Sequence, residues 1–89
     1  MSDSCYVTNL NIIDERLVDG LKCQAKFRYR QADNEVSVKF DGDNLIVSYP
    51  QGIKSVTPGQ EAVFYLDGVC LGGGTIDKVF KNNKQMIYK

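Results

Sequence analysis

The sequence predicts a single all-β domain, built from short strands as a small barrel or a sandwich. Apolar and polar residues alternate with a period of two in several segments, which is the period of a strand. Turn-forming residues separate these segments at short intervals. No segment keeps a helical period over three turns; residues 12–21 hold five apolar side chains, but Gly20 and an acidic cluster argue against a helix. A length of 89 residues supports one domain only.

The expected strands follow from this alternation. Residues 21–30 show it most clearly, because their odd positions are apolar or aromatic, whereas their even positions are polar and include four cations. Residues 35–41 and 44–49 repeat the pattern, and residues 60–66 (QEAVFYL) are rich in side chains that suit a pleated sheet. The expected strands are residues 5–10, 21–30, 35–41, 44–49, 60–66, 69–76 and 85–88, the first and last on weaker patterns.

Turn-forming sequences lie between these segments. Residues 41–44 (DGDN) indicate a hairpin loop, and residues 67–68 (DG) carry the strongest hairpin signal in the chain. Residues 57–60 (TPGQ) fit a type II turn, because proline fixes φ at the second position and glycine allows a positive φ at the third. The asparagines at 82–83 could turn a last hairpin.

The composition excludes several kinds of chemistry. The chain has no histidine, so a Ser-His-Asp triad, a Cys-His pair and most catalytic zinc sites are unavailable within it. Its three cysteines, Cys5, Cys23 and Cys70, are odd in number and form no C-x-x-C motif, which argues against a disulfide framework or a four-cysteine zinc site. We expect reduced thiols packed as small hydrophobes. A redox or sulfur-carrier module that uses these cysteines remains an alternative.

The start of the chain and its apolar runs bear on location. The longest apolar runs are a few residues, too short to cross a bilayer. Met1 is followed by Ser2, Asp3 and Ser4, whereas a signal peptide needs a basic start and an apolar core. We therefore expect a cytoplasmic protein that has no membrane partner.

Two local motifs resemble binding loops but lack the required residues. The triple glycine at 72–74 is followed by Thr75, Ile76 and Asp77, whereas a P-loop ends in Gly-Lys-Ser/Thr. We expect this segment to be a strand that bends sharply or passes close to another backbone. The Asp-Gly-Asp start of residues 41–44 resembles a calcium loop, but the later ligand positions do not match, so we expect solvated turn carboxylates.

Charge is segregated along the chain although the formal net charge is zero. Residues 22–30 carry four cations and no acid, and residues 31–77 carry two cations against seven acids. On an extended strand, the cations from Lys22 to Arg30 would form a row about 26 Å long on one face. Such a row suits a phosphate backbone, but charge alone favours the alternative that it protects an edge strand from aggregation.

Three sequence blocks support a family resemblance. In their order and spacing, residues 26–33 (KFRYRQAD), 56–65 (VTPGQEAVFY) and 68–74 (GVCLGGG) resemble the C-terminal domain of bacterial tRNA-specific 2-thiouridylase. Older descriptions call that enzyme tRNA (5-methylaminomethyl-2-thiouridylate) methyltransferase. Residues 9–11 (NLN) are similar to the first strand of that domain, so the resemblance covers roughly residues 2–77.

The resemblance implies a fold and a role. The fold would be a small antiparallel β-barrel of about six strands, similar to the second domain of elongation factor Tu. Residues 1–89 would form a single C-terminal domain of a larger enzyme whose catalytic and central domains lie outside this chain. That enzyme uses ATP to adenylate C2 of the wobble uridine of tRNA, and a cysteine persulfide, supplied through a sulfur-relay protein, then delivers sulfur. The domain itself would hold tRNA, have no cofactor and be catalytically inert.

The resemblance also implies site residues. Arg28, Tyr29 and Gln60 match positions that contact tRNA in the family, and the cationic row adds Lys26 and Arg30. Strict alternation points Arg28 and Tyr29 to opposite faces, so joint contact would need a strand end or a bulge.

A second interpretation of the domain's role does not involve RNA binding. The domain could be a structural barrel that docks on the central domain, which the zero net charge and the absence of tryptophan favour. Under either reading, the resemblance implies that Cys23 and Cys70 are packed thiols and not sulfur carriers.

Overall fold

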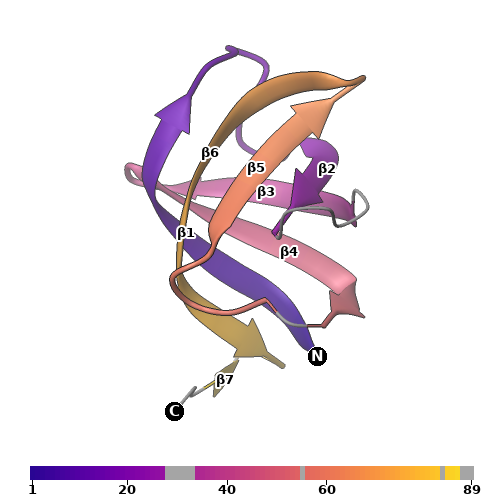
Figure 1. The fold of residues 1–89 in the computed structure, drawn as a ribbon, viewed down its shortest axis with the longest axis vertical. Helices are drawn as coiled ribbons and strands as arrows, with labels where there is room; N and C mark the ends of the chain where they lie inside the picture. The colour runs from indigo at the N-terminus through magenta and orange to yellow at the C-terminus, as the bar shows by residue number, and fades with distance from the viewer. Residues whose placement is uncertain (28–33, 55, 83, 87–89) are drawn as a thin grey trace.

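Seven β-strands run through the described part of the chain. The computed structural model describes residues 1–27, 34–54, 56–82 and 84–86. The strands are β1 (Ser2–Ile12), β2 (Lys22–Lys26), β3 (Asn34–Asp41), β4 (Asn44–Ile53), β5 (Glu61–Leu66), β6 (Val69–Lys81) and β7 (Lys84–Gln85) (Figure 1). Residues 13–21 cross the top of the view in Figure 1 as turns and bends. Within the described ranges, no helix has the length and hydrophobicity to span a membrane.

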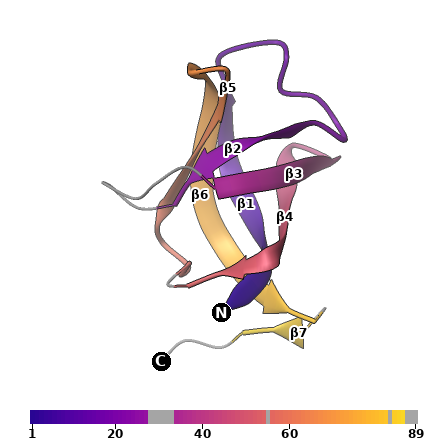
Figure 2. The ribbon, with the colours of Figure 1, turned by 90° about the vertical axis from the view of Figure 1, so that its right-hand side faces the viewer.

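Six of the strands close into an antiparallel barrel. They pair in the order β1-β4-β3-β2-β5-β6, and β6 pairs back with β1. Closure depends on the length of β1, whose first half pairs with β4 while most of its length pairs with β6. β7 adds a short hairpin at the end of β6, outside the ring (Figure 2). The prediction of a six-stranded antiparallel barrel is therefore confirmed, and the sandwich is excluded.

In each alternating segment, the side chains of the apolar face point into the core of the barrel. On β2, Cys23 and Ala25 are fully buried, and their even-numbered neighbours face outward, as the sequence predicts. The rings of Phe27 and Tyr49 pack with centroids 5.4 Å apart in a tilted arrangement. The hydroxyl of Tyr49 forms a buried hydrogen bond of 2.8 Å with Oγ of Ser2. The remaining buried apolar side chains include Cys5, Val7, Val36, Val38, Leu45, Val47, Ala62, Phe64, Leu71, Ile76 and Val79.

The predicted turns are present. Asp67 and Gly68 have φ values of 52° and 78°, which is the two-residue hairpin turn that a DG sequence favours. Gly42 has a φ of 60° in the β3–β4 hairpin. Gly59 has a φ of 92° in the type II turn that precedes β5. Asn82, with a φ of 51°, turns the chain between β6 and β7.

The triple glycine allows β6 to pass close to both of its neighbours. A Cβ atom on Gly73 would lie 2.6 Å from the carbonyl oxygen of Ala62 on β5. One on Gly74 would lie 2.6 Å from the carbonyl oxygen of Thr8 on β1. Gly72 has a φ of 152°, which residues with side chains rarely adopt. The close backbone passage predicted for this segment is therefore confirmed, and the glycines are explained by the fold.

The ends of β1, β2, β4 and β6 differ from the expected ranges. The strand expected over residues 21–30 ends at Lys26, where Phe27 forms a bend. β4 continues past the expected end at residue 49 to Ile53. Pro50 is tolerated there because the register between β1 and β4 shifts at this point, and a proline, which has no N–H to donate, fits at such an irregularity.

β6 is five residues longer than the strand expected over residues 69–76, because it pairs with β1 beyond that range. A register shift in this pairing leaves Asp77 and Lys78 both exposed, which breaks the two-residue alternation by which a strand is recognised. β7 is a two-residue strand; the second half of the range expected for it, 85–88, lies outside the described residues.

Candidate functional site

The outer face of β2 carries the described part of the cationic row. Lys22, Gln24 and Lys26 alternate with the buried side chains, so they lie on one face over about 13 Å. The Nζ atom of Lys26 lies 5.5 Å from the centroid of the Tyr65 ring on neighbouring β5, within the range of a cation–π contact. Nε2 of Gln24 donates a 3.0 Å hydrogen bond to Oε1 of Glu35 on β3.

Three of the predicted tRNA-binding residues, Arg28, Tyr29 and Arg30, lie outside the described residues. The row of about 26 Å expected from Lys22 to Arg30 is therefore described only for its first half. The extended strand that was to carry all of it ends at Lys26.

Gln60 holds the turn that leads into β5. Its side-chain Oε1 accepts a 3.2 Å hydrogen bond from the backbone N–H of Thr57, which closes the turn on itself. The turn is also tied to β6, because the N–H of Gly59 donates to the carbonyl of Ile76 and the N–H of Ile76 donates to the carbonyl of Gln60, each at 2.8 Å. Gln60 is half-buried and lies three residues before Val63, the cross-strand partner of Lys26. Strand geometry thus separates the Cα atoms of Gln60 and Lys26 by about 11 Å.

Tyr65 is a surface residue that the sequence analysis did not single out. It is half-buried, faces outward beside Lys26, and pairs across the sheet with Gln24. The signal for it was present, because alternation in QEAVFYL buries Ala62 and Phe64 and turns Tyr65 to the other face. An aromatic side chain next to a cation is the combination that single-stranded nucleic-acid sites use for bases and phosphates.

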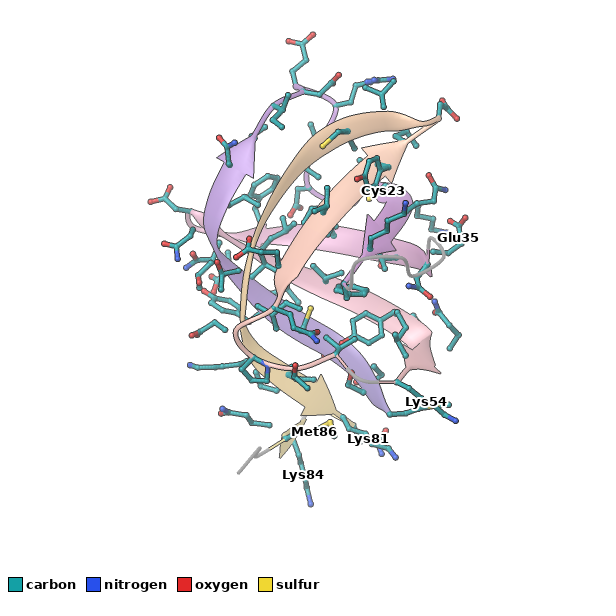
Figure 3. All side chains as sticks on the ribbon, in the orientation of Figure 1. Cys23, Glu35, Lys54, Lys81, Lys84 and Met86 are labelled. Atoms are coloured by element: carbon teal, nitrogen blue, oxygen red, sulfur yellow. The ribbon has the colours of Figure 1, made fainter. Side chains whose placement is uncertain are left out.

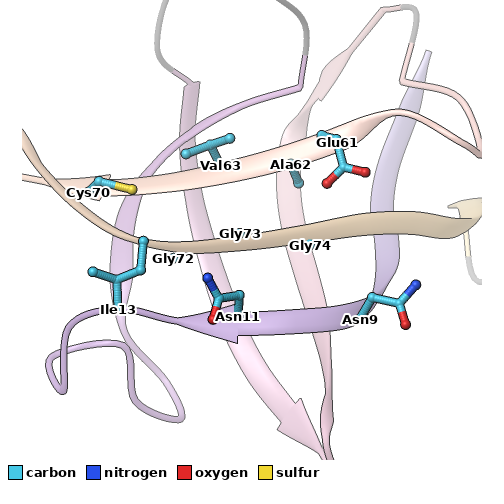
Figure 4. A pocket seen from close by; sticks show the side chains of 10 residues that line it. All are labelled: Asn9, Asn11, Ile13, Glu61, Ala62, Val63, Cys70, Gly72, Gly73 and Gly74. Atoms are coloured by element: carbon cyan, nitrogen blue, oxygen red, sulfur yellow. The ribbon is translucent and has the colours of Figure 1, made fainter.

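A shallow hollow lies beside this surface, above the glycines of β6. It has a volume of about 280 Å³ and is shown in Figure 4. Asn11 and Glu61 lie on opposite sides of the glycine strand, and Ile13 and Cys70 lie at one end. Cross-strand pairing places Lys26, Val63, Gly73 and Asn11 in one row around the barrel, so the hollow is continuous with the outer face of β2.

The three thiols differ in environment. Burial raises the pKa of Cys5 to about 12, partly offset by a hydrogen bond with Tyr49. Burial, with a smaller effect of the Glu35 charge, raises the pKa of Cys23 to about 11. Both are packed neutral thiols, as predicted, and such thiols are poor nucleophiles at neutral pH. The prediction for Cys70 was wrong in part, because this side chain is half-exposed at the hollow.

Several acidic residues of the described chain make local contacts. Asp14 pairs with Arg16 through two hydrogen bonds of 3.0 and 3.1 Å, and this lowers the pKa of the Asp14 carboxyl. Asp41 accepts a 2.8 Å hydrogen bond from the hydroxyl of Tyr6, which raises the pKa of that hydroxyl. No group of three or more potential metal ligands comes together among the residues that the structure describes.

The fold and surface define a small antiparallel β-barrel domain. Residues 2–76 match the family described as the aminomethyltransferase β-barrel domain. The chain belongs to this family, and the resemblance identified from its sequence is confirmed.

Similarity to individual proteins is high over nearly the whole chain. The chain is 47% identical to the tRNA-specific 2-thiouridylase MnmA of Bacillus licheniformis over 91 residues, which cover 98% of this chain and 24% of that protein. It is 52% identical to the protein of the same name from Mycoplasma capricolum over 86 residues, 90% of this chain and 23% of that protein. The Staphylococcus aureus protein is 49% identical over 88 residues, again 23% of its length. The chain thus spans about a quarter of the curated relatives it matches.

Proposed function

We propose that this barrel is the tRNA-binding accessory domain of a tRNA 2-thiouridylase and that it is not itself catalytic. The observation that carries the proposal is the placement of Lys22 and Lys26 on one outward face of β2, with the Tyr65 ring against Lys26. Similarity to 2-thiouridylases over nearly the whole chain supports it. The barrel would position tRNA through its backbone while another part of the enzyme carries out the chemistry.

In this proposal each surface residue has a defined task. Lys22 and Lys26, followed by Arg28 and Arg30, would neutralise successive phosphates. Tyr29 and Tyr65 would offer ring faces on which unpaired bases can stack. The amide nitrogen of Gln60 would donate to RNA, while its Oε1 holds the turn through Thr57.

The remainder of the enzyme would supply what the described barrel does not show. It would bind ATP, adenylate C2 of the wobble uridine, and transfer sulfur from a cysteine persulfide that a relay protein loads. The raised pKa values of Cys5 and Cys23 disfavour a sulfur-carrier role for those two thiols. The catalytic and central parts of the same polypeptide would be the domain's permanent partners.

Binding to tRNA at two salt concentrations tests the proposal. Four phosphate contacts predict a slope of log K against log salt of about −3 on a single strand, so affinity should be modest and strongly salt-dependent. Lys22→Ala and Lys26→Ala should each reduce the magnitude of the slope by about 0.7. The matched control is Lys84→Ala, which removes one charge at the β7 end of the barrel, away from Cys23 on β2 and Glu35 on neighbouring β3 (Figure 3).

This control distinguishes an effect of the position of the charge on β2 from an effect of the overall charge of the barrel. If Lys84→Ala weakens binding as much as Lys26→Ala, the effect is one of overall charge and β2 is not the contact face. If neither β2 variant changes the affinity for tRNA at low salt, the alternative gains support, in which the barrel only docks on the rest of the enzyme without contacting RNA.

A further inference from the structure

A second surface of the barrel is apolar where the chain leaves β1. Ile12 and Ile13 are 50% and 66% exposed, and Val69, at the start of β6, is 43% exposed. Ile12 pairs with Gly72, and Ile13 and Cys70 line the same glycine-floored hollow. Ile13 thus lies at the hollow, and large exposed apolar side chains beside a hollow are characteristic of surfaces that another molecule covers.

The backbone fixes these side chains on the outside. The N–H groups of Ile13 and Asp14 both donate to the carbonyl of Leu71, at 2.9 and 3.1 Å. Leu71 itself is fully buried, so the adjoining core position is already filled. Ile13 therefore cannot turn inward without breaking the backbone contacts that anchor the end of β1.

The charge around this surface is opposite to that of β2. Glu61 lines the hollow, Asp14 and Glu15 follow Ile13 directly, and Asp67 turns the neighbouring hairpin. The cation in this set is Arg16, which is already engaged by Asp14. An acidic rim repels phosphates, so the surface is unsuited to RNA and suits a protein segment with apolar side chains flanked by basic ones.

We propose that this apolar surface, formed by Ile13 and the glycine-floored hollow and flanked by Ile12 and Val69, packs against an apolar, basic segment of the enzyme polypeptide beyond this domain. The inference rests on the proposed function only in that it takes the barrel to be one part of a larger enzyme. About three quarters of each matched relative lies outside the region that corresponds to this chain. The barrel would then hold the enzyme at the hollow beside the end of β1 and RNA on the adjoining outer face of β2.

Cys70 provides a direct probe, because it lines the hollow and is half-exposed in the barrel. The rate of its alkylation by N-ethylmaleimide is compared in two proteins by peptide mass spectrometry. One is the 89-residue chain alone, and the other is the Bacillus licheniformis 2-thiouridylase with its matching region replaced by this chain. Docking should slow labelling of Cys70 at least about tenfold in the full-length protein without RNA.

Matched variants identify the surface that is covered. Ser48→Cys, on the outer face of β4, should label equally in both proteins. Ile13→Ser should restore rapid labelling of Cys70 in the full-length protein, whereas Ile46→Ser, at an exposed position on β4, should not. Slow labelling of buried Cys5 in both proteins reports that the barrel is folded.

Three results would overturn the inference. Equal labelling of Cys70 in the two proteins would mean that nothing covers the hollow. Protection that appears only when tRNA is added would assign the surface to RNA. Protection in the isolated chain that grows with its concentration would assign it to a second copy. The first and third results are obtained without RNA and do not depend on Lys22 or Lys26, so failure there is distinct from failure of RNA binding by β2.

Discussion

The ammonium group of Lys26 lies over the ring of Tyr65, 5.5 Å from its centroid, and so joins β2 to β5 on the outside of the barrel. A cation–π contact at such a surface contributes about 0.5–1 kcal/mol. In urea unfolding, the double variant Lys26→Met, Tyr65→Leu should lose less stability than the two single variants lose in sum. The difference should equal the energy of the contact. Additivity within about 0.3 kcal/mol would contradict an energetic contact.

Gly73→Ala should destabilise the barrel strongly. Its Cβ would lie 2.6 Å from the carbonyl oxygen of Ala62, a backbone atom that cannot move without separating β5 from β6. We expect a loss of about 1–3 kcal/mol or more in the free energy of unfolding, measured with urea. Gly20→Ala is the control: nothing lies within 4 Å of an added Cβ there, and only its φ of 84° resists substitution, which costs about 1–2 kcal/mol. An equal or smaller loss at Gly73 would contradict the close passage.

Tyr49→Phe should leave the buried hydroxyl of Ser2 without its hydrogen-bond partner. The Tyr49 hydroxyl and Ser2 Oγ are hydrogen-bonded at 2.8 Å, and Tyr49 is fully buried. The variant leaves Ser2 without this partner, so we expect a loss of about 1–3 kcal/mol in thermal or urea unfolding. The double variant that adds Ser2→Ala should recover part of the loss, since the Ser2 hydroxyl is then removed and only the Cys5 thiol still lacks its bond with Tyr49. If Ser2→Ala brings no recovery, the hydroxyl pair does not account for the effect.

Gln60→Glu should separate the structural role of this residue from its proposed contact with RNA. The carboxylate keeps an acceptor for the N–H of Thr57, so stability should stay near that of the wild-type chain. Gln60→Ala removes the acceptor and should cost about 0.5–1.5 kcal/mol. Affinity for tRNA should fall in the Glu variant, because a negative charge is placed near phosphates. Unchanged affinity in the Glu variant would argue against a contact at residue 60.

Stability should decline above pH 9. Burial raises the pKa of the Cys5 thiol from 9.0 to about 12 and that of Cys23 to about 11, so the unfolded chain releases these protons more readily than the folded one. The stability due to the neutral thiols is complete below pH 9 and is lost as the pH rises towards the folded pKa values. Each group should lower the free energy of unfolding by about 1.4 kcal/mol per pH unit in that window.

Urea unfolding at pH 8, 9 and 10 measures this decline, and Cys5→Val should reduce its slope. Val38→Ala, a buried position without a titratable group, should lower stability at every pH and leave the slope unchanged. A free energy of unfolding that does not vary above pH 9 would contradict the burial of both thiols.

Much of the strand pattern could be predicted because its causes are local. Alternation correctly assigned Cys23 and Ala25 to the core and Lys22 and Lys26 to the surface. The turn at Asp67 depends on backbone preferences of two adjacent residues, so it could be read directly. Prediction failed at the ends of β4 and β6, where register shifts against β1 interrupt the alternation.

The candidate site was predicted only in part, since its parts come from distant segments. The cationic residues of β2 lie close together in sequence, so the sequence pattern identified them. Tyr65 comes beside them from β5 only through strand pairing. Gln60 was expected to contact RNA, but its bond to Thr57 becomes visible only in the turn geometry.

The amino-acid order alone determined that this chain forms short strands with one apolar face each, because the side-chain period and the turn residues act over a few neighbouring positions. Tertiary structure decided that the strands close into a barrel, since the pairing of β1 with both β4 and β6 joins residues far apart in the chain. It also placed a basic face on β2 and an acid-rimmed apolar face beyond β1, because cross-strand register, and not sequence proximity, selects which side chains share a surface.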